Sequence, residues 1–398
     1  MSAIQLKRLS KNDKGNVVPS GENNILVFDF ETSGLPDEKA DYDFTLEDNL
    51  QYWSDGKPKW KQIKRKDESG KDVWMLPKVK DKDGKDVIRN GNTIDIEIQQ
   101  GTASNPDYWP HSVQFCYLTY NKENGDLNIF NKIIKLPDGA TIIPRSFQIH
   151  SISEEMTNRP VGYEGTIDQV IDIIQKDGEG NPMKDENNKP IVADQKRYKI
   201  DIEIIDENGQ EKVKTNKYEE GNEPSTGVKK KTERTTIEEA INSFIEDYNN
   251  ANVIIENNIR FDRNMILVEL KRLTLKYKDE PELYTKYNDF MKKFYDNKKE
   301  YCTMNHGAND YKQDRTKIWT KTDTYKTGRN RGQKYYTSPK LMDLYATLFG
   351  YRPDESKLHD AKADVIVCFR CFYMMRYGQD IYVTAASDSQ IKEEINMI

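Results

Sequence analysis

Two carboxylates stand two residues apart where an apolar segment near the N-terminus ends. Residues 27–35 read VFDFETSGL, so Asp29 and Glu31 lie where the continuous apolar strand predicted at 24–30 gives way to a small polar turn. Residues two apart on a strand point to the same face, so both side chains should enter one small volume. Like charges this close repel, and one carboxylate stays protonated unless a cation lies between them. Taken alone, the pair is better explained as an exposed strand end with solvated acids.

Two further acids change that interpretation. Asp262, in ENNIRFDRN at 256–264, begins a helix that follows a core strand, and strand ends and helix N-termini of α/β sheets gather into ligand sites. By itself it is better explained as a helix-start residue favoured by the helix dipole. Asp364, in LHDAKADVIVCF at 358–369, borders the buried stripe of the last helix, where a carboxylate is paired, bound to metal or energetically costly. Together the four acids predict one anionic pocket suited to hard divalent cations, which select oxygen ligands.

A histidine precedes the helix that carries Asp364. His359 lies five positions earlier, about 140° round a helix with about 3.6 residues per turn. Both side chains can therefore face one point only if the histidine lies on the loop before the helix, with Asp360 as its N-cap. A histidine whose unperturbed pKa is near ~6.5 can accept a proton at neutral pH.

The segments that must position these residues predict a mixed α/β sheet with helices packed on it. Predicted strands cover 24–30, 112–120, 126–136, 253–256 and 302–304, the second and third as an antiparallel pair joined by the turn NKENG. Predicted helices begin at a capping box formed by Thr236 and Glu239, and cover about 261–276, 281–299 and 360 onward.

Polar segments interrupt this core. Residues 37–106 are rich in Lys, Asp and Gly and contain GKDV twice, which predicts small hairpins. Residues 161–232 alternate turns with strand-like runs and predict a second β-rich insertion, and 306–337 form a third. We expect a single domain over 22–380 that carries these insertions, followed by a C-terminal tail at 381–398.

Composition excludes several classes of protein. The 398 residues carry a net charge of -6, which excludes a protein that is basic all over but leaves room for a local phosphate-binding patch. The four cysteines are scattered, and the CxxC of Cys368 and Cys371 has no second pair to complete a zinc site, so buried thiols in a reducing compartment are expected. Because no apolar stretch resembles a signal peptide or a membrane span, we expect a cytoplasmic protein with no membrane partner.

Four segments, VFDFETSGL, IHSISEEM, NNIRFD and LHDAKADVIVCFRCFY, closely resemble in their order the DnaQ-like, or DEDDh, family of 3′→5′ exonucleases, which has a ribonuclease H-like fold. SPKLMDLYATLFGY at 338–351 is similar to the usual lead-in to the last motif. The resemblance covers the core segments, somewhat over half the chain, and not the insertions. The chain departs from the family at Asn257, where His is common, and at Ser151, where the family often has HGI. Neither change touches an expected ligand, and His150 is expected to make a structural hydrogen bond.

The resemblance implies a site with two Mg²⁺ or Mn²⁺ ions. Asp29, Glu31 and Asp364 would hold the first ion, and Asp29 would also help to hold the second. Asp262 would complete the second ion's site, directly or through water. His359 would be the general base that deprotonates the attacking water. The expected reaction is hydrolysis of the phosphodiester bond at the 3′ end of DNA or RNA, which releases nucleoside 5′-monophosphates.

Substrate contacts are expected in two regions. The resemblance implies that Thr32 and the following turn lie along the terminal nucleotide, that Leu35 packs against its base and that Asn258 hydrogen-bonds near the 3′ end. The segment 311–337 interleaves basic and aromatic residues, as in hairpins that contact phosphates and stack on unpaired bases. A solvated hairpin with ordinary surface charge explains it equally well. Its candidate contacts are Trp319, Arg329 and Arg331.

Two other functions compete with the exonuclease. One is a nucleic-acid-binding scaffold that uses the same fold and its insertions to contact a polymerase or another replication or repair protein. A complete set of five active-site residues argues against pure scaffolding. The other is a ribonuclease H-like endonuclease, in which His359 has no obvious place.

Overall fold

The computed structural model describes residues 23–36, 106–175, 183–186, 189–222, 226–295, 300–309, 322–324, 332–353, 359–384 and 389–396, together with short strands between 51 and 93. The chain divides into two compact units. The first comprises Met1–Leu35, Pro110–Glu269 and Asp296–Ile398, and the second comprises Pro36–Trp109 and Leu270–Tyr295.

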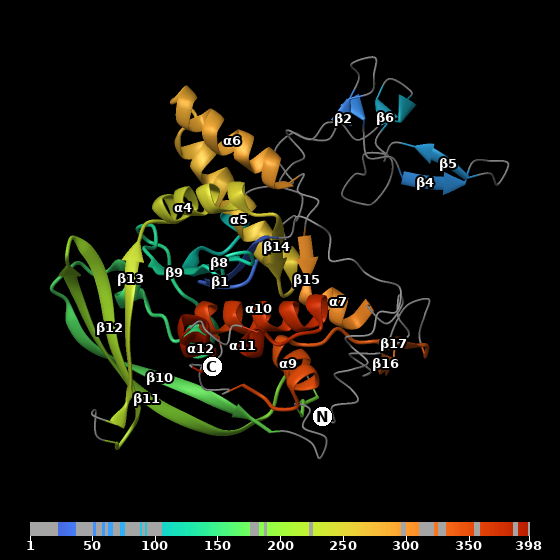
Figure 1. Cartoon of the computed structure of the whole chain (residues 1–398). Coiled ribbons are helices and arrows are strands. Elements are labelled where there is room, and N and C mark those ends of the chain that lie inside the picture. The colour runs from blue at the N-terminus through green and yellow to red at the C-terminus, as the bar shows by residue number, and fades with distance from the viewer. Residues whose placement is uncertain are drawn as a thin grey trace. The chain divides into compact units, whose positions relative to one another are not determined.

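The first unit is built on a nine-stranded mixed sheet in the order β10-β11-β12-β13-β9-β8-β1-β14-β15 (Figure 1). The strand β1 (Asn24–Thr32) pairs antiparallel with β8 (Ser112–Asn121), which pairs antiparallel with β9 (Leu127–Ile134). On its other side β1 runs parallel to β14 (Val253–Glu256), and β14 runs parallel to β15 (Glu300–Cys302). The predicted mixed α/β sheet and its antiparallel pair are confirmed.

The two faces of β1 are covered by different helices (Figure 1). Ile25 and Val27 pack in one core cluster with residues of α10 (Ala361–Tyr377). Phe28 belongs to the opposite face, where its ring meets Phe244 of α4 (Ile237–Asn250) edge-on, with 5.2 Å between centroids. Because side chains alternate along a strand, the row that starts with Ile25 and Val27 continues with Asp29 and Glu31 on the side of α10. The apolar row therefore ends in two acids.

Local capping places two helix starts as the sequence predicts. Thr236 and Glu239 form the reciprocal capping box at the start of α4. Asp360 is the N-cap of α10, and its side chain accepts a hydrogen bond from the backbone N–H of Lys362. At the other end α10 stops at Gly378, whose φ of 66° is the left-handed conformation that glycine tolerates best.

The second predicted insertion forms four strands, as expected. These are β10 (Glu164–Ile174), β11 (Val192–Glu207), β12 (Gln210–Glu219) and β13 (Val228–Thr235), here called the extension. The sequence does not predict that β13 pairs parallel with β9, so that the extension continues the central sheet. A separate apolar cluster, which includes Ile152, Met156, Ile200 and Val213, joins it to the helices α2 (Pro144–His150) and α3 (Glu154–Asn158).

Further elements of the first unit lie towards the C-terminus. The helices are α7 (Thr303–Asn309), α9 (Leu341–Phe349), α11 (Ile381–Thr384) and α12 (Ser389–Asn396). Strands β16 (Thr322–Thr324) and β17 (Lys334–Tyr336) pair antiparallel, in agreement with the hairpin predicted in 311–337. Across the described parts of both units, no helix combines the length and apolar character needed to cross a bilayer.

The helix α5 (Ile259–Lys276) begins in the first unit and ends in the second. Within the second unit, the guanidinium of Arg272 donates to the carbonyls of Pro106 and Trp109, both at 2.8 Å. The other described elements there are the short helix η1 (Pro106–Tyr108) and α6 (Pro281–Tyr295). Residues 37–106, where the two GKDV copies predict a pair of small hairpins, contain three antiparallel strand pairs. These are β2 (Gln51–Tyr52) with β3 (Pro58–Lys59), β4 (Ile63–Lys66) with β5 (Asp72–Met75), and β6 (Ile88–Arg89) with β7 (Asn92–Thr93).

Candidate active site

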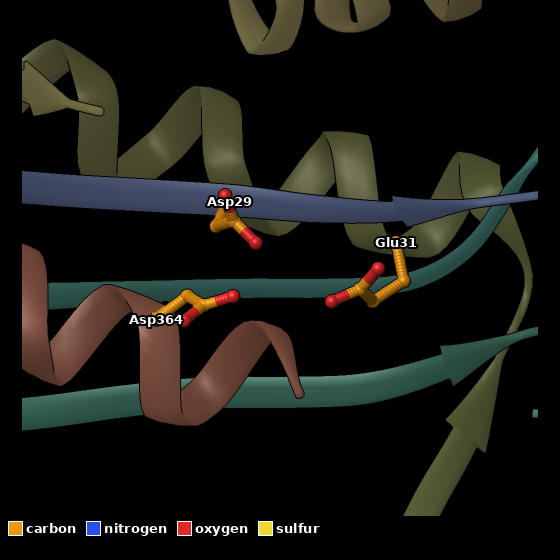
Figure 2. A group of neighbouring side chains, drawn as sticks. All are labelled: Asp29, Glu31 and Asp364. Carbon is orange, nitrogen blue, oxygen red and sulfur yellow. The ribbon is translucent and has the colours of Figure 1, made fainter. Parts of the chain in front are cut away.

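Three carboxylates meet at the end of β1. Asp29, Glu31 and Asp364 each offer one oxygen atom, and these atoms lie within 4.8 Å of one another. Figure 2 shows Asp29 and Glu31 projecting from β1 and Asp364 projecting from the first turns of α10 into the same space. The strand alternation and the helix spacing thus deliver acids from opposite ends of the chain to one point, close enough to share a cation.

Asp262 is the fourth acid at this end of the sheet, and it is more deeply buried than the other three. It lies in the first turn of α5 with 4% of its surface exposed, and its carboxylate accepts a hydrogen bond from the backbone N–H of Phe30. The pairing of β1 with β14 covers only Ile25 to Val27, so Asp262 bonds the part of β1 that β14 no longer accompanies. Asp262 is not one of the three acids that share the 4.8 Å span, but among the charges that raise the pKa of Asp29 its contribution is the largest.

Burial and mutual repulsion dominate the electrostatics of the cluster, and the charge of Lys230 opposes them only weakly at Glu31. Burial, and then the charges of the neighbouring acids, raise the pKa values of Asp29 and Glu31 well above their ordinary range. Burial likewise raises the pKa of Asp262 to about 8 and that of Asp364 to about 7, although hydrogen bonds from backbone N–H groups oppose the shift. Within the described residues, none of the four acids forms an ion pair with a lysine or arginine.

His359 immediately precedes this helix, as its spacing from Asp364 requires. It has a φ of 62°, and its backbone N–H donates to the carboxylate of Asp364. The residue is exposed, and desolvation of the ring followed by the positive charge of Lys340 lowers its pKa below 6.5. The imidazole is therefore largely neutral at pH 7 and able to accept a proton.

Asp360, between His359 and the helix, is held by groups that the sequence analysis missed. Its carboxylate accepts hydrogen bonds from Gln114 Nε2 at 2.8 Å and from Lys230 Nζ at 2.7 Å. Burial acts to raise the pKa of Asp360, but the charge of Lys230 and these hydrogen bonds outweigh it and lower the pKa. The position of Gln114 within the apolar strand at 112–120 could have indicated a polar role for it. Lys230 stands among three consecutive lysines, and nothing in the sequence distinguishes it from the other two.

His150 has the structural role expected of it. Its Nδ1 accepts a hydrogen bond from the backbone N–H of Ile152 at 3.0 Å, so Nε2 carries the proton and donates to the carbonyl of Thr32 at 3.2 Å. Burial lowers the pKa of His150 to about 4, which keeps the ring neutral. The histidine therefore fixes the turn that follows the acid pair.

The predicted substrate contacts fall into three groups. Thr32 is buried and its hydroxyl donates to the carbonyl of Gly34 at 2.8 Å, while Leu35 is 72% exposed at the end of the same turn. Asn258 is exposed with a φ of 65°, four residues before Asp262. The third group, Trp319, Arg329 and Arg331, lies outside the described residues.

A fifth buried acid, Glu256, escaped the sequence analysis because VIIE looks like an ordinary strand end. It is 1% exposed, and burial, then the charges of Asp262 and Glu300, raise its pKa well above 4.5. Its Oε2 atom has no hydrogen-bond partner among the residues that the structure describes. Burial therefore shifts the equilibrium of this carboxyl group towards its protonated form.

The donor set at the end of β1 fits a hard divalent cation. Carboxylate oxygens are the ligands that Mg²⁺ and Mn²⁺ prefer, and among the described residues the cluster includes no thiol that would favour a softer metal. No protein-family model matches the chain, and no curated protein matches it by sequence. The function of the site must therefore be inferred from its own geometry.

Proposed function

We propose that the chain is a metal-dependent 3′→5′ exonuclease of the DnaQ-like type. It would hydrolyse the terminal phosphodiester bond of DNA or RNA and release nucleoside 5′-monophosphates. The observation that carries the proposal is the meeting of Asp29, Glu31 and Asp364 within 4.8 Å, without an ion-pair partner among the described residues. When bound there, two divalent ions would stabilise the attacking and leaving oxygens of the phosphodiester.

Each residue has a role that follows from its position. Asp29, Glu31 and Asp364 would hold the first ion, and Asp262, with Asp29, would hold the second. His359 would take the proton of the attacking water, for which its lowered pKa and exposed position suit it. The turn from Thr32 to Leu35 would position the terminal nucleotide, and its exposed leucine can pack on a base.

The fold supports the same proposal. The five strands β9-β8-β1-β14-β15 form a mixed sheet with α10 against one face and α4 against the other, as expected for a ribonuclease H-like domain (Figure 1). Every proposed ligand lies at one end of this sheet, on β1, α5 or α10. The site thus draws on rigid elements, which hold catalytic groups more accurately than loops do.

The test is degradation of labelled oligonucleotides. With Mg²⁺ or Mn²⁺, a 5′-labelled oligonucleotide should shorten stepwise from its 3′ end and a 3′-labelled one should release mononucleotide at once. EDTA should abolish both. Single-stranded DNA, duplex DNA and RNA, compared in parallel, would identify the preferred substrate.

Two controls make the result decisive. Asp168→Asn, at an exposed acid of the edge strand β10 that pairs with Lys199, removes a carboxylate that is not among the proposed ligands and should degrade at the wild-type rate. A closed circular substrate should survive. Degradation that EDTA does not affect, or cleavage of the circle, would refute the proposal, and binding without any cleavage would favour the scaffold.

A further inference from the structure

A cavity of about 570 Å³ lies between the start of α10 and the extension. On the side of the active site it is lined by Gln114, His359 and Asp360. On the side of the extension its lining includes Tyr198 and two lysines, Lys217 and Lys230. The cavity is therefore continuous with the proposed catalytic centre, and it has the size of a typical ligand site.

The lysines on the two faces of β12 have different partners. On one face Lys212 pairs with Glu207 at 2.8 Å and Lys214 pairs with Glu203 at 3.2 Å. The other face turns Val213, Thr215 and Lys217 into the cavity. Lys217 is half-buried, donates to Ser151 Oγ at 2.9 Å and lies 4.7 Å from the ring of Tyr198, but it meets no carboxylate among the described residues.

The neighbouring cation in the cavity is already neutralised. Lys230 pairs with Asp360 at 2.7 Å, and the other acid of the lining, Glu219, is exposed. Burial and the charge of Lys230 lower the pKa of Lys217 to about 8, so its ammonium form still prevails at pH 7. An anion that entered the cavity would meet Lys217 as the cation with no acidic partner.

Ser151 links Lys217 to the active site through hydrogen bonds. Its φ of 62° is the left-handed conformation, which costs a residue with a Cβ more than it costs glycine. The serine hydroxyl offsets that cost, because it accepts hydrogen bonds from Lys217 and from Gln169 Nε2 on β10 at 3.0 Å. The preceding residue, His150, bonds the carbonyl of Thr32. Lys217 is thus linked through α2 to the turn expected to hold the terminal nucleotide.

We propose that the cavity binds the unpaired strand of the substrate next to its 3′-terminal nucleotide, with Lys217 on a backbone phosphate and Tyr198 against a base. The proposal rests on the proposed exonuclease function. In it, the extension binds the single strand of the substrate. Stacking on an aromatic side chain requires an unstacked base, which a single strand supplies and a duplex does not. The lysine and the tyrosine together supply the two contacts that characterise such grooves.

The test compares Lys217→Met, which keeps the apolar stem, with Lys217→Arg, which keeps the charge. The probes are labelled oligothymidylate and oligouridylate, degraded with Mg²⁺ over a range of salt concentrations. Lys217→Met should raise KM about 10-fold with little change in kcat. It should also reduce the slope of log KM against log salt by about 0.7. Lys217→Arg should keep KM and the salt slope close to their wild-type values. The matched control is Lys214→Met, on the opposite face of β12, which should match the wild type.

Length dependence separates this proposal from the proposed function. On the p-nitrophenyl ester of thymidine 5′-monophosphate, which has no nucleotide next to its terminal one and therefore nothing to place in the cavity, Lys217→Met and wild type should converge. If the wild type degrades oligonucleotides but Lys217→Met shows the same KM and salt slope, or loses equally on the p-nitrophenyl ester, the cavity proposal is wrong and the exonuclease stands. If the wild type degrades nothing, the proposed function itself fails. An effect on duplex as large as on single strand would also overturn the proposal.

Discussion

Two charged groups on the same helix, Arg370 and Asp364, have opposite surroundings. Arg370 of α10 is 4% exposed and forms an ion pair with Asp380 at 2.6 Å. It also donates to the hydroxyls of Tyr345 and Tyr351, and its guanidinium lies 4.2 Å from the ring centroid of Phe349. Burial disfavours its charge, but Asp380 more than compensates and the pKa of Arg370 is raised.

Less than two turns earlier, Asp364 shares its space with two further carboxylates and has no such partner in the described part of the chain. The difference separates a structural charge from a functional one. A buried charge whose partners are complete can only stabilise or specify the fold. A buried group of like charges is stable only with protons or an added cation, so its natural partner must come from solution.

The largest effect is expected from Asp364→Asn, which tests whether this acid is functional. The variant removes a ligand without changing side-chain volume, and we expect kcat in Mg²⁺ to fall by more than about 10³-fold. Without metal it should melt no lower than wild type, because one repelling charge is gone. Single-turnover kinetics and thermal melts in EDTA measure the two effects. Degradation at the wild-type rate would place the chemistry elsewhere.

Arg370→Met, in contrast, is expected to lower the stability of the fold. Removal of the guanidinium leaves Asp380 partly buried and without its ion-pair partner, and we expect the free energy of unfolding to fall by about 3–5 kcal/mol. Urea denaturation measures the loss. The double variant Arg370→Met/Asp380→Leu should recover much of it, since neither charge is then left alone. A single variant as stable as wild type would show that this cluster is not structural.

The pH dependence of stability should reveal the four acids that form no ion pair within the described residues. Their pKa values are higher in the folded than in the unfolded chain, so the folded state binds more protons and metal-free stability should fall as pH rises. The loss should begin above about pH 4 and continue as the pH rises through the folded pKa values of Asp364, about 7, and of Asp262, about 8. Mg²⁺ should restore stability most strongly at the alkaline end. Melting curves with EDTA and with Mg²⁺ test this, and a metal effect independent of pH would contradict it.

Glu256→Gln should have the smallest effect. Burial acts against the charged form of Glu256, and glutamine keeps the shape of the side chain without a charge. We expect kcat to change by less than about tenfold. A much larger loss would place Glu256 among the metal ligands and enlarge the cluster. Glu246→Gln, at an exposed position of α4, is the matched control.

Local patterns in the sequence were sufficient for several features. The apolar run that ends in Asp29 and Glu31 predicted a buried strand with a charged end, and the Thr236–Glu239 spacing predicted a capping box that is present. The argument that His359 must precede the helix also agrees with the structure, where α10 begins at Ala361. These features depend on strand alternation, helix periodicity and caps, which act over a few residues.

Tertiary structure alone decided which polar residues meet. Nothing in 161–232 indicates that β13 joins β9, and therefore nothing indicates which lysines of the extension face the active site. Lys214 and Lys217 are indistinguishable in sequence, yet one is paired with Glu203 and the other lies in the cavity. A one-residue change of register would exchange the two faces, because strand side chains alternate with a period of two. The register is set by packing between segments far apart in the chain, and this long-range packing is the information that a single sequence does not display.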